Sequence, residues 1–150
     1  MNPDSTQLTR RKFVGFGLAA VAAGTATSRA QSPNSKLSMG IIGSGGRGGA
    51  NLNGVKNEHI HTLCDINRNT LVAAQKRFKN AKTTTDWREV VADPKIDAVV
   101  ISTADHHHAP AAIAAMRAGK HVYCEKPLAH TVQEARWMQE EYAKSKVATQ

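Results

Sequence analysis

The sequence predicts an α/β fold with a doubly wound parallel sheet, in which helices cover both faces. Short apolar runs alternate along the chain with longer stretches of helical character, which is typical of strands joined by crossover helices. A glycine-rich turn at residues 43–48 directly follows the first apolar run. Residues 98–101, Ala-Val-Val-Ile, are a continuous apolar run suited to a strand that is covered on both sides.

The first elements are predicted from residue 37 onward. Residues 37–42 are a short apolar strand that leads into the glycine turn, and residues 47–56 are a helix weakened by further glycines. Residues 59–64 are the second strand. Asn67 can cap the next helix, whose apolar positions have roughly helical spacing. These positions are Leu71, Val72, Ala74 and Phe78.

The middle of the chain repeats the pattern. Residues 82–85 are a short β-branched strand, and Asp86 caps a brief helix that runs to Val91. Asp93-Pro94 marks the turn into the fourth strand, which contains the apolar run at 98–101.

The last elements complete a sheet with the expected strand order 3-2-1-4-5. A polar loop at 104–108 precedes an alanine-rich helix from Pro110, which Gly119 ends. Residues 121–124 are the fifth strand. The capping box Thr131-Val132-Gln133-Glu134 opens a helix to about Lys146, and residues 147–150 have the character of a sixth strand.

Residues 1–30 predict an export signal. Arg10 and Arg11 precede an apolar, glycine-diluted run at 14–27, and small residues lead to a cleavage site near Ala30. The run is too short to span a membrane, so no stable membrane anchor is expected. The segment resembles a twin-arginine signal, which implies the twin-arginine translocase as a partner and a periplasmic or secreted location. The alternative is a basic tail before a buried helix.

The remaining composition allows one domain at 37–150, after a polar linker at 31–36. The formal charge is +8, of which residues 1–30 carry +3. Beyond them no basic stripe is interleaved with aromatic residues, so no nucleic-acid partner is expected. Cys64 and Cys124 end the second and fifth strands, roughly 14 Å apart at ~4.8 Å per strand. A disulfide spans at most about 7 Å between Cα atoms, so both are expected to be buried small hydrophobic residues.

The glycine turn has the context that dinucleotide binding requires, because it lies between a strand and a helix. Gly43 permits the tight turn, Gly45 lets the backbone approach a pyrophosphate, and Gly48 lets the helix pack on the strand. Asp65 follows Gly43 by 22 positions and can accept the ribose hydroxyls. An acidic residue there favours NAD over NADP, although the nearby Arg68 reduces how strongly the sequence favours NAD. A plain glycine turn and a helix-capping Asp65 are the alternatives.

Two further motifs lie near the ends of later strands. The successive histidines 106–108 cannot converge on one ion from a single element, so no metal site is expected. His108 is expected to face a nicotinamide pocket, the alternative being exposed loop histidines. Lys126 lies between a buried strand and Pro127, where its amine can exchange a proton with a carbinol oxygen during hydride transfer. A plain surface lysine is the alternative.

Taken together, residues 40–48, Cys64-Asp65, residues 102–110 and residues 118–127 resemble the Gfo/Idh/MocA oxidoreductases. Ala104 and His107 replace a proline and a tryptophan that are common there. The resemblance implies a Rossmann domain that binds NAD(P), sugar, inositol or polyol substrates, and Lys126 as a catalytic residue. The cofactor-binding residues expected on this basis are Gly43, Ser44, Gly45, Gly46, Arg47, Gly48, Asp65, Thr103, Asp105, His108, Glu125 and Lys126.

Three functions stay open at this point. The first is an exported NAD-dependent sugar or polyol dehydrogenase, represented by its cofactor domain without the C-terminal α/β substrate domain. The second is a glycosidase of the same superfamily that uses NAD transiently, although the lysine motif favours the first. The third is a non-catalytic NAD-binding module. A homo-oligomer of a longer parent is compatible with each.

Overall fold

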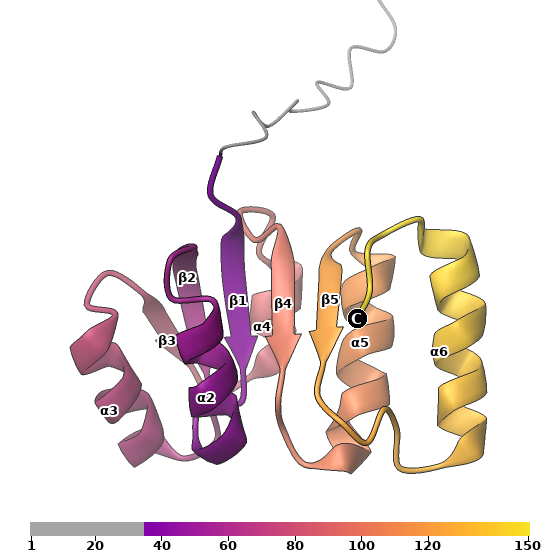
Figure 1. The fold of residues 1–150 in the computed structure, drawn as a ribbon, viewed down its shortest axis with the longest axis horizontal. Coiled ribbons are helices and arrows are strands. Elements are labelled where there is room, and N and C mark those ends of the chain that lie inside the picture. Colours follow the sequence, from indigo (N-terminus) through magenta and orange to yellow (C-terminus); the bar gives the residue numbers. More distant parts are fainter. Residues whose placement is uncertain (1–34) are drawn as a thin grey trace, which may run out of the picture. The chain divides into compact units, whose positions relative to one another are not determined.

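A five-stranded parallel sheet forms the centre of the protein (Figure 1). The computed structural model describes residues 35–150, so the predicted export signal and most of the predicted linker lie outside the described residues. The strand order is β3-β2-β1-β4-β5, which confirms the predicted topology. The strands are β1 (Ser38–Ile42), β2 (His59–Cys64), β3 (Lys82–Thr84), β4 (Ala98–Ile101) and β5 (His121–Cys124).

Helices connect the strands and cover both faces of the sheet. In Figure 1 all strands point the same way, so their carboxyl ends meet at the lower edge. The helices are α2 (Gly46–Gly54), α3 (Arg68–Arg77), α4 (Trp87–Ala92), η1 (Asp105–His107, a 3₁₀ turn), α5 (His108–Arg117) and α6 (Val132–Ser145).

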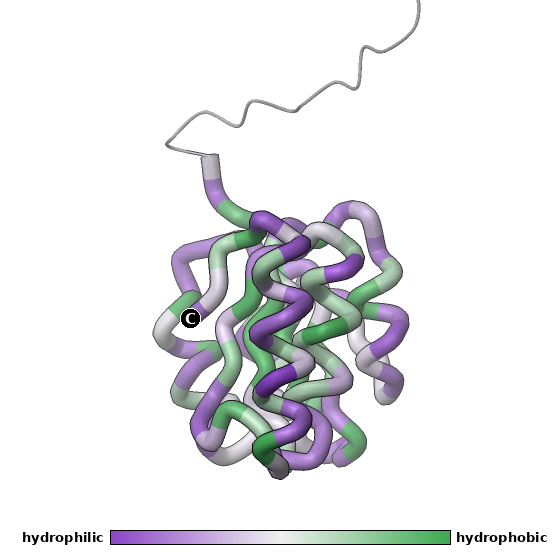
Figure 2. The backbone as a smooth tube through the Cα atoms, turned by 90° about the vertical axis from the view of Figure 1, so that its right-hand side faces the viewer, coloured by the Kyte–Doolittle hydropathy of each residue, from purple (hydrophilic) through white to green (hydrophobic). Residues whose placement is uncertain are grey.

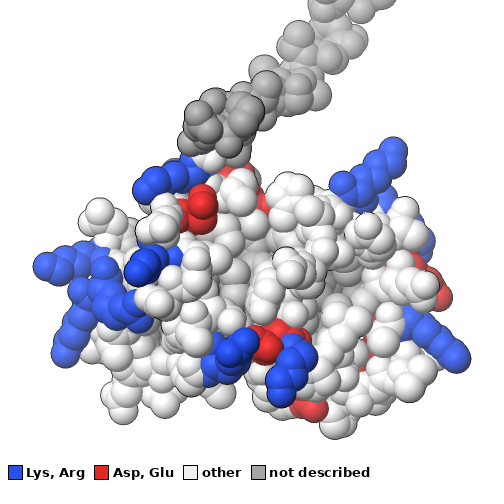
Figure 3. Space-filling view, in the orientation of Figure 1, with Lys and Arg blue, Asp and Glu red and all other residues white. Residues whose placement is uncertain are grey.

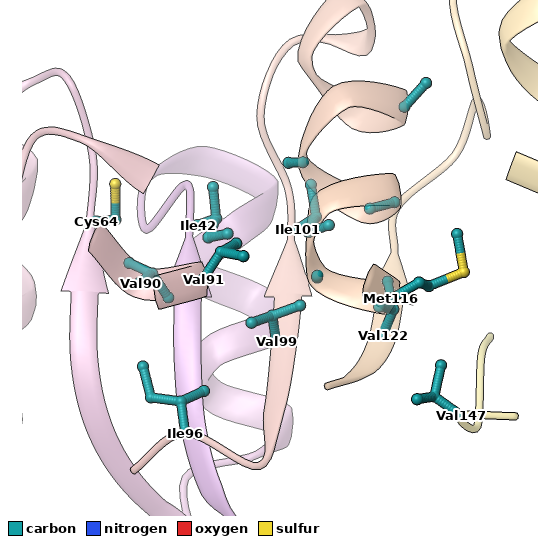
Figure 4. Packing of buried hydrophobic residues seen from close by; sticks show 14 of the residues in the cluster. Ile42, Cys64, Val90, Val91, Ile96, Val99, Ile101, Met116, Val122 and Val147 are labelled. Atoms are coloured by element: carbon teal, nitrogen blue, oxygen red, sulfur yellow. The ribbon is translucent and has the colours of Figure 1, made fainter. Parts of the chain in front are cut away.

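The buried residues form one apolar cluster on each face, because neighbouring residues of a strand point to opposite sides. Ile41 packs in the cluster with α2 and α3, whereas Ile42 packs in the cluster with α4, α5 and α6. Figure 4 shows Ile42 beside Val91 of α4 in the second cluster. Seen from the side, apolar segments run through the middle of the domain (Figure 2). The two layers fix the sheet and hence the edge at which the strands end.

The predicted helix caps are present. Asn67 accepts a hydrogen bond from the backbone N–H of Asn69 at 3.0 Å, and Asp86 accepts one from Arg88 at 2.9 Å. Thr131 and Glu134 form the expected capping box. Each cap satisfies N–H groups that a helix leaves without intrahelical partners, so these helices begin where the sequence predicts.

The start of α5 differs from the prediction. The segment expected to be a loop at 104–108 contains η1, and α5 begins at His108 rather than at Pro110. A proline in the first helical turn loses nothing, because the N–H groups of that turn have no intrahelical acceptor. Pro110 therefore marks the first turn of the helix and not its first residue.

The cysteines are free, and one of them differs from expectation. Cys64 is buried, and burial raises the pKa of its thiol to about 12. Cys124 is only half-buried, because it lines a hollow beside α5 and α6. Burial still raises the pKa of its thiol to about 11. Beyond β5, Thr149 pairs with Val122 as a parallel bridge, so the last residues do extend the sheet.

Within residues 35–150, no helix has both the length and the apolar character that a membrane span needs.

Candidate functional site

The glycine turn joins β1 to α2 at the carboxyl edge of the sheet. Gly43 has a φ of +87°, and a Cβ there would lie 2.5 Å from the carbonyl oxygen of Ser102. A Cβ on Gly48 would overlap the carbonyl oxygen of Gly43, so the helix lies directly against the turn. Both positions require glycine, as the sequence predicted for the tight turn and for close helix packing. The predicted role of Gly45 toward a pyrophosphate stays a prediction.

Asp65 is folded onto the glycine turn. Its Oδ2 accepts hydrogen bonds from the backbone N–H groups of Ser44 at 2.9 Å and Gly45 at 3.2 Å, and its Oδ1 accepts one from Asn67 at 2.9 Å. The sequence predicted this carboxylate as a ribose acceptor and did not foresee that it also shapes the turn. A carboxylate has about four acceptor sites, so Oδ1 retains capacity for a ligand hydroxyl.

A cleft of about 680 Å³ opens beside the turn. It lies where β1, β2 and β4 end, which is the usual ligand position in an open parallel sheet. Four predicted cofactor residues line it, namely Gly43, Gly45, Asp65 and Thr103. The other predicted positions on the turn, Ser44, Gly46, Arg47 and Gly48, are not among its lining residues.

The cleft has aromatic walls that the sequence analysis missed. The guanidinium of Arg88 lies 4.8 Å from the ring centre of Trp87, and the rings of His106 and His107 lie 4.4 Å apart. All four line the cleft. The signal was present in the sequence, since Trp87 follows the third strand and such positions reach the same edge of the sheet.

Glu125 and Arg47 form an ion pair with each other. Glu125 is 8% exposed, and its Oε2 accepts hydrogen bonds from Asn51 Nδ2 at 2.8 Å and Arg47 Nε at 2.9 Å. Its Oε1 accepts the backbone N–H of Lys126 at 3.1 Å. The bonds from Asn51, Arg47 and Lys126 lower the pKa of Glu125 to about 2. The predicted cofactor-binding roles of Glu125 and Arg47 stay predictions, and the structure adds that the two side chains are paired with each other.

Lys126 itself is exposed at the same edge. Figure 3 shows acidic and basic side chains next to one another at the lower centre of this face, near where the strands end. Lys126 does not line the 680 Å³ cleft. Its backbone N–H is held by Glu125, whereas its side chain is exposed to solvent. The predicted catalytic role of Lys126 stays a prediction.

His108 does not face an open pocket. It is 1% exposed, with Nδ1 at 2.6 Å from the carbonyl oxygen of Pro127 and Nε2 at 3.0 Å from that of Thr103. The prediction of a pocket-facing histidine is wrong for a physical reason: His108 begins α5, and the packing of that helix turns its ring inward. The ring joins the loop after β4 to the turn after β5.

Asp105 forms a second, outer connection between the same two loops. Its Oδ2 lies 3.1 Å from Nδ1 of His130, a residue to which the sequence gave no role. The hydrogen bond from His130 lowers the pKa of Asp105, and Asp105 in turn raises the pKa of His130. Asp105 is thus engaged with His130 instead of lining the cleft. Among the described residues no group of three or more His, Cys, Asp or Glu side chains could hold a metal ion.

The sequence model described as "Oxidoreductase family, NAD-binding Rossmann fold" (GFO_IDH_MocA) matches residues 37–150. The chain belongs to the Gfo/Idh/MocA oxidoreductase family. The match spans all of the described sheet and its helices, so the glycine turn, the cleft and the Lys126 turn are parts of a family domain.

Three relatives illustrate the range of the family. Levoglucosan dehydrogenase of Pseudarthrobacter phenanthrenivorans is 45% identical over 76 residues, 51% of this chain and 20% of that protein. A glycosyl hydrolase family 109 protein of Solibacter usitatus is 32% identical over 140 residues, 78% of this chain and 32% of that protein. The crystal structure of myo-inositol dehydrogenase from Lactobacillus casei in complex with NAD(H) and myo-inositol superimposes with a TM-score of 0.71 at 29% identity, covering 77% of this chain and 36% of the other.

The chain therefore spans little more than a third of the length of these relatives at most. The family match at residues 37–150 contains the glycine turn and the cleft beside it.

The depressed pKa of Glu125 predicts an acid-dependent loss of stability. Between about pH 4.5, the ordinary pKa of glutamate, and about pH 2, the unfolded chain binds a proton that the folded chain does not. The free energy of unfolding should therefore rise with pH across this window, and the contribution should be complete above it. Glu125→Gln should unfold more easily at neutral pH and show a flatter dependence below pH 4.5. Urea unfolding at a series of pH values measures both.

Glu141→Gln is the matched control, because Glu141 also accepts a hydrogen bond from an arginine, Arg117. Equal slopes for the wild-type chain and Glu125→Gln would contradict the assignment of the shift to Glu125.

Proposed function

We propose that the chain is the NAD-binding part of an oxidoreductase that transfers a hydride from a sugar, inositol or related polyol. One observation carries the proposal: the glycine turn, the 680 Å³ cleft and Lys126 lie together at the carboxyl edge of the sheet. Membership of the family supports it, as do relatives named as sugar and inositol dehydrogenases.

The residues around the turn suit a dinucleotide. The first N–H groups of α2 lack intrahelical acceptors and lie at the positive end of the helix dipole, which favours a pyrophosphate. The absence of side chains at Gly43 and Gly48 keeps the backbone of the turn compact. Asp65 can accept a ribose hydroxyl, and the flat groups of Trp87 and His107 offer apolar walls for an adenine.

We assign the proton transfer to Lys126, whose side chain is exposed where β5 ends. A bound NAD would supply the acceptor for the hydride of a carbinol carbon. The Lys126 amine would take the proton of the same carbinol hydroxyl, so the alcohol becomes a carbonyl, and would return it in the reverse direction. The buried Glu125 fixes the backbone beside it.

A glycoside hydrolase that uses NAD transiently is the second candidate. The similarity to a glycosyl hydrolase family 109 protein over 140 residues supports it. The retained Glu125-Lys126-Pro127 motif favours the dehydrogenase. A longer protein that contains this chain separates the two: a dehydrogenase forms NADH from a polyol, whereas a glycosidase releases the aglycone of an aryl glycoside without net NADH. A chain that binds NAD and supports neither reaction would be a non-catalytic module.

The chain should bind NAD in preference to NADP. The carboxylate of Asp65 repels a 2′-phosphate, whereas Arg68 lines a different pocket beside β3. Asp65→Asn should reduce the ratio of NAD affinity to NADP affinity by about 10-fold. Repulsion between the Asp65 carboxylate and a 2′-phosphate near 4 Å costs roughly 1–4 kcal/mol at effective dielectric constants of 80 to 20. Calorimetric titration with each dinucleotide measures the ratio.

Asp86→Asn is the control, because it removes another carboxylate that lines the cleft and should leave the ratio unchanged. The absence of NAD binding by the wild-type chain at millimolar concentration would overturn the proposed function itself.

Lys126→Met should affect catalysis more than binding. In a longer protein with its substrate-binding part, loss of a general acid/base should lower turnover by about 10²- to 10⁴-fold. The melting temperature and the NAD affinity should change little, because the exposed amine does not line the cleft. Steady-state kinetics with a polyol substrate and NAD titration make the comparison; near-normal turnover would leave Lys126 without a catalytic role.

We also propose export by the twin-arginine route, supported by the paired arginines before a mild apolar run. That route carries folded proteins, so a cofactor loaded in the cytoplasm would travel with the domain. Exchange of both Arg10 and Arg11 for Lys should retain the precursor in the cytoplasm, as measured by fractionation of producing cells. Lys36→Arg, beyond the signal, should be exported normally, and periplasmic recovery of the doubly changed protein would contradict the proposal.

A further inference from the structure

The backbone around Lys126 is held from both sides. Before it, the N–H of Glu125 donates to the carbonyl oxygen of Ile101 at 2.9 Å, which continues the pairing of β5 with β4. At Lys126 itself, the N–H donates to Glu125 Oε1 at 3.1 Å. After it, the carbonyl oxygen of Pro127 lies 2.6 Å from Nδ1 of His108. The amine thus extends from a backbone with little freedom.

The second oxygen of Glu125 reaches a different element. Oε2 accepts hydrogen bonds from Asn51 Nδ2 at 2.8 Å and from Arg47 Nε at 2.9 Å. These two residues lie one turn apart on the same face of α2. Asn51 Nδ2 also donates to Ser102 Oγ, at the end of β4, at 2.9 Å. One carboxylate therefore joins the helix that follows the glycine turn to the backbone of Lys126.

The burial of this carboxylate makes the connection difficult to break. Glu125 is only 8% exposed, so its negative charge depends on its hydrogen-bond donors for compensation. Hydrogen bonds to an ionised group are shorter and stronger than neutral ones. Loss of the α2 donors would leave an uncompensated charge beside the end of β5, and the turn would move to reach water.

We propose that Glu125 and Asn51 are positioning residues that couple the glycine turn to Lys126, so that a dinucleotide bound at the turn also restrains the lysine. This inference rests on the proposed function for the identity of the ligand. Arg47 reinforces the coupling from the outer side, where its side chain is 66% exposed.

The N–H of Lys126 is a direct reporter of the coupling, because its acceptor is Glu125. Amide hydrogen exchange measured by NMR on the 150-residue chain reports how often this N–H opens, and the amide of Val99 in the inner strand β4 reports global unfolding. If NAD binds only the closed form, exchange at Lys126 should slow by the factor 1 + [NAD]/Kd, about 100-fold at 100 times Kd. Unchanged Lys126 exchange in a chain whose glycine-turn signals shift with NAD would overturn the coupling.

Asn51→Asp breaks the connection with almost no change in shape. It places a second carboxylate against Glu125, and two like charges at this distance repel. Exchange at Lys126 should become at least about 10-fold faster, because a hydrogen bond to an ionised carboxylate is lost, and NAD should no longer slow it. Asn53→Asp is the control on the same helix, where Asn53 accepts a hydrogen bond from Arg77. Wild-type exchange in Asn51→Asp would refute the role of Asn51.

Arg47→Met tests the connection without adding a charge, should Asn51→Asp fail to fold. Its control is Arg117→Met, because Arg117 forms a similar ion pair with Glu141 at 2.8 Å. The side chains of Arg117 and Glu141 are 68% and 12% exposed, close to the 66% and 10% of Arg47 and Glu125. Exchange at Lys126 should be faster in Arg47→Met alone, with Val99 unchanged. Equal exchange in both variants would count against the inference.

The outcomes separate this inference from the proposed function. If the wild-type chain does not bind NAD, the proposed function fails, while the variants still test the Glu125 connection in the free protein. If NAD binds and Lys126 exchanges independently of it, the proposed function stands and the coupling is wrong.

Discussion

Parallel pairing of the strands is the constraint on which the rest of the structure depends. Because all five strands run in one direction, the segments after β1, β2, β4 and β5 meet at a single edge. Gly43, Asp65, Thr103 and Lys126 are far apart in the sequence and reach that edge only through this arrangement. The two apolar clusters hold the strands in register. The geometry of the edge therefore depends on the packing of the core.

Ionised groups at this edge are arranged in two ways. Asp65 and Glu125 use their oxygens to fix backbone N–H groups, one in the glycine turn and the other at Lys126. Lys126 keeps an exposed side chain beside them. The acidic residues therefore stabilise the loops, whereas the lysine side chain stays exposed to solvent. A carboxylate beside the glycine turn can therefore stabilise a loop as well as accept a ligand hydroxyl.

Much of this fold follows from local signals in the sequence. The caps of Asn67 and Asp86 and the capping box at Thr131 depend on residues a few positions apart. The strand order follows from the alternation of strands and helices, which implies a doubly wound parallel sheet. The side-chain partners of the site do not. Glu125 and Asn51 are separated by 74 positions, and nothing local in either segment indicates the other. His108 shows the same limit, because only the packing of α5 decides which way its ring points.

The two connections between the loops after β4 and β5 differ in their contact with solvent. His108 is buried, whereas Asp105 and His130 have 40% and 59% exposed side chains. Mobile ions reach the exposed pair and screen its charges over a Debye length of about 8 Å at physiological ionic strength, so the pair is weak in salt. Rising salt thus weakens the outer connection between Asp105 and His130 and leaves the buried connection through His108 intact. The outer part of the two loops is therefore sensitive to ionic strength, whereas their buried part is not.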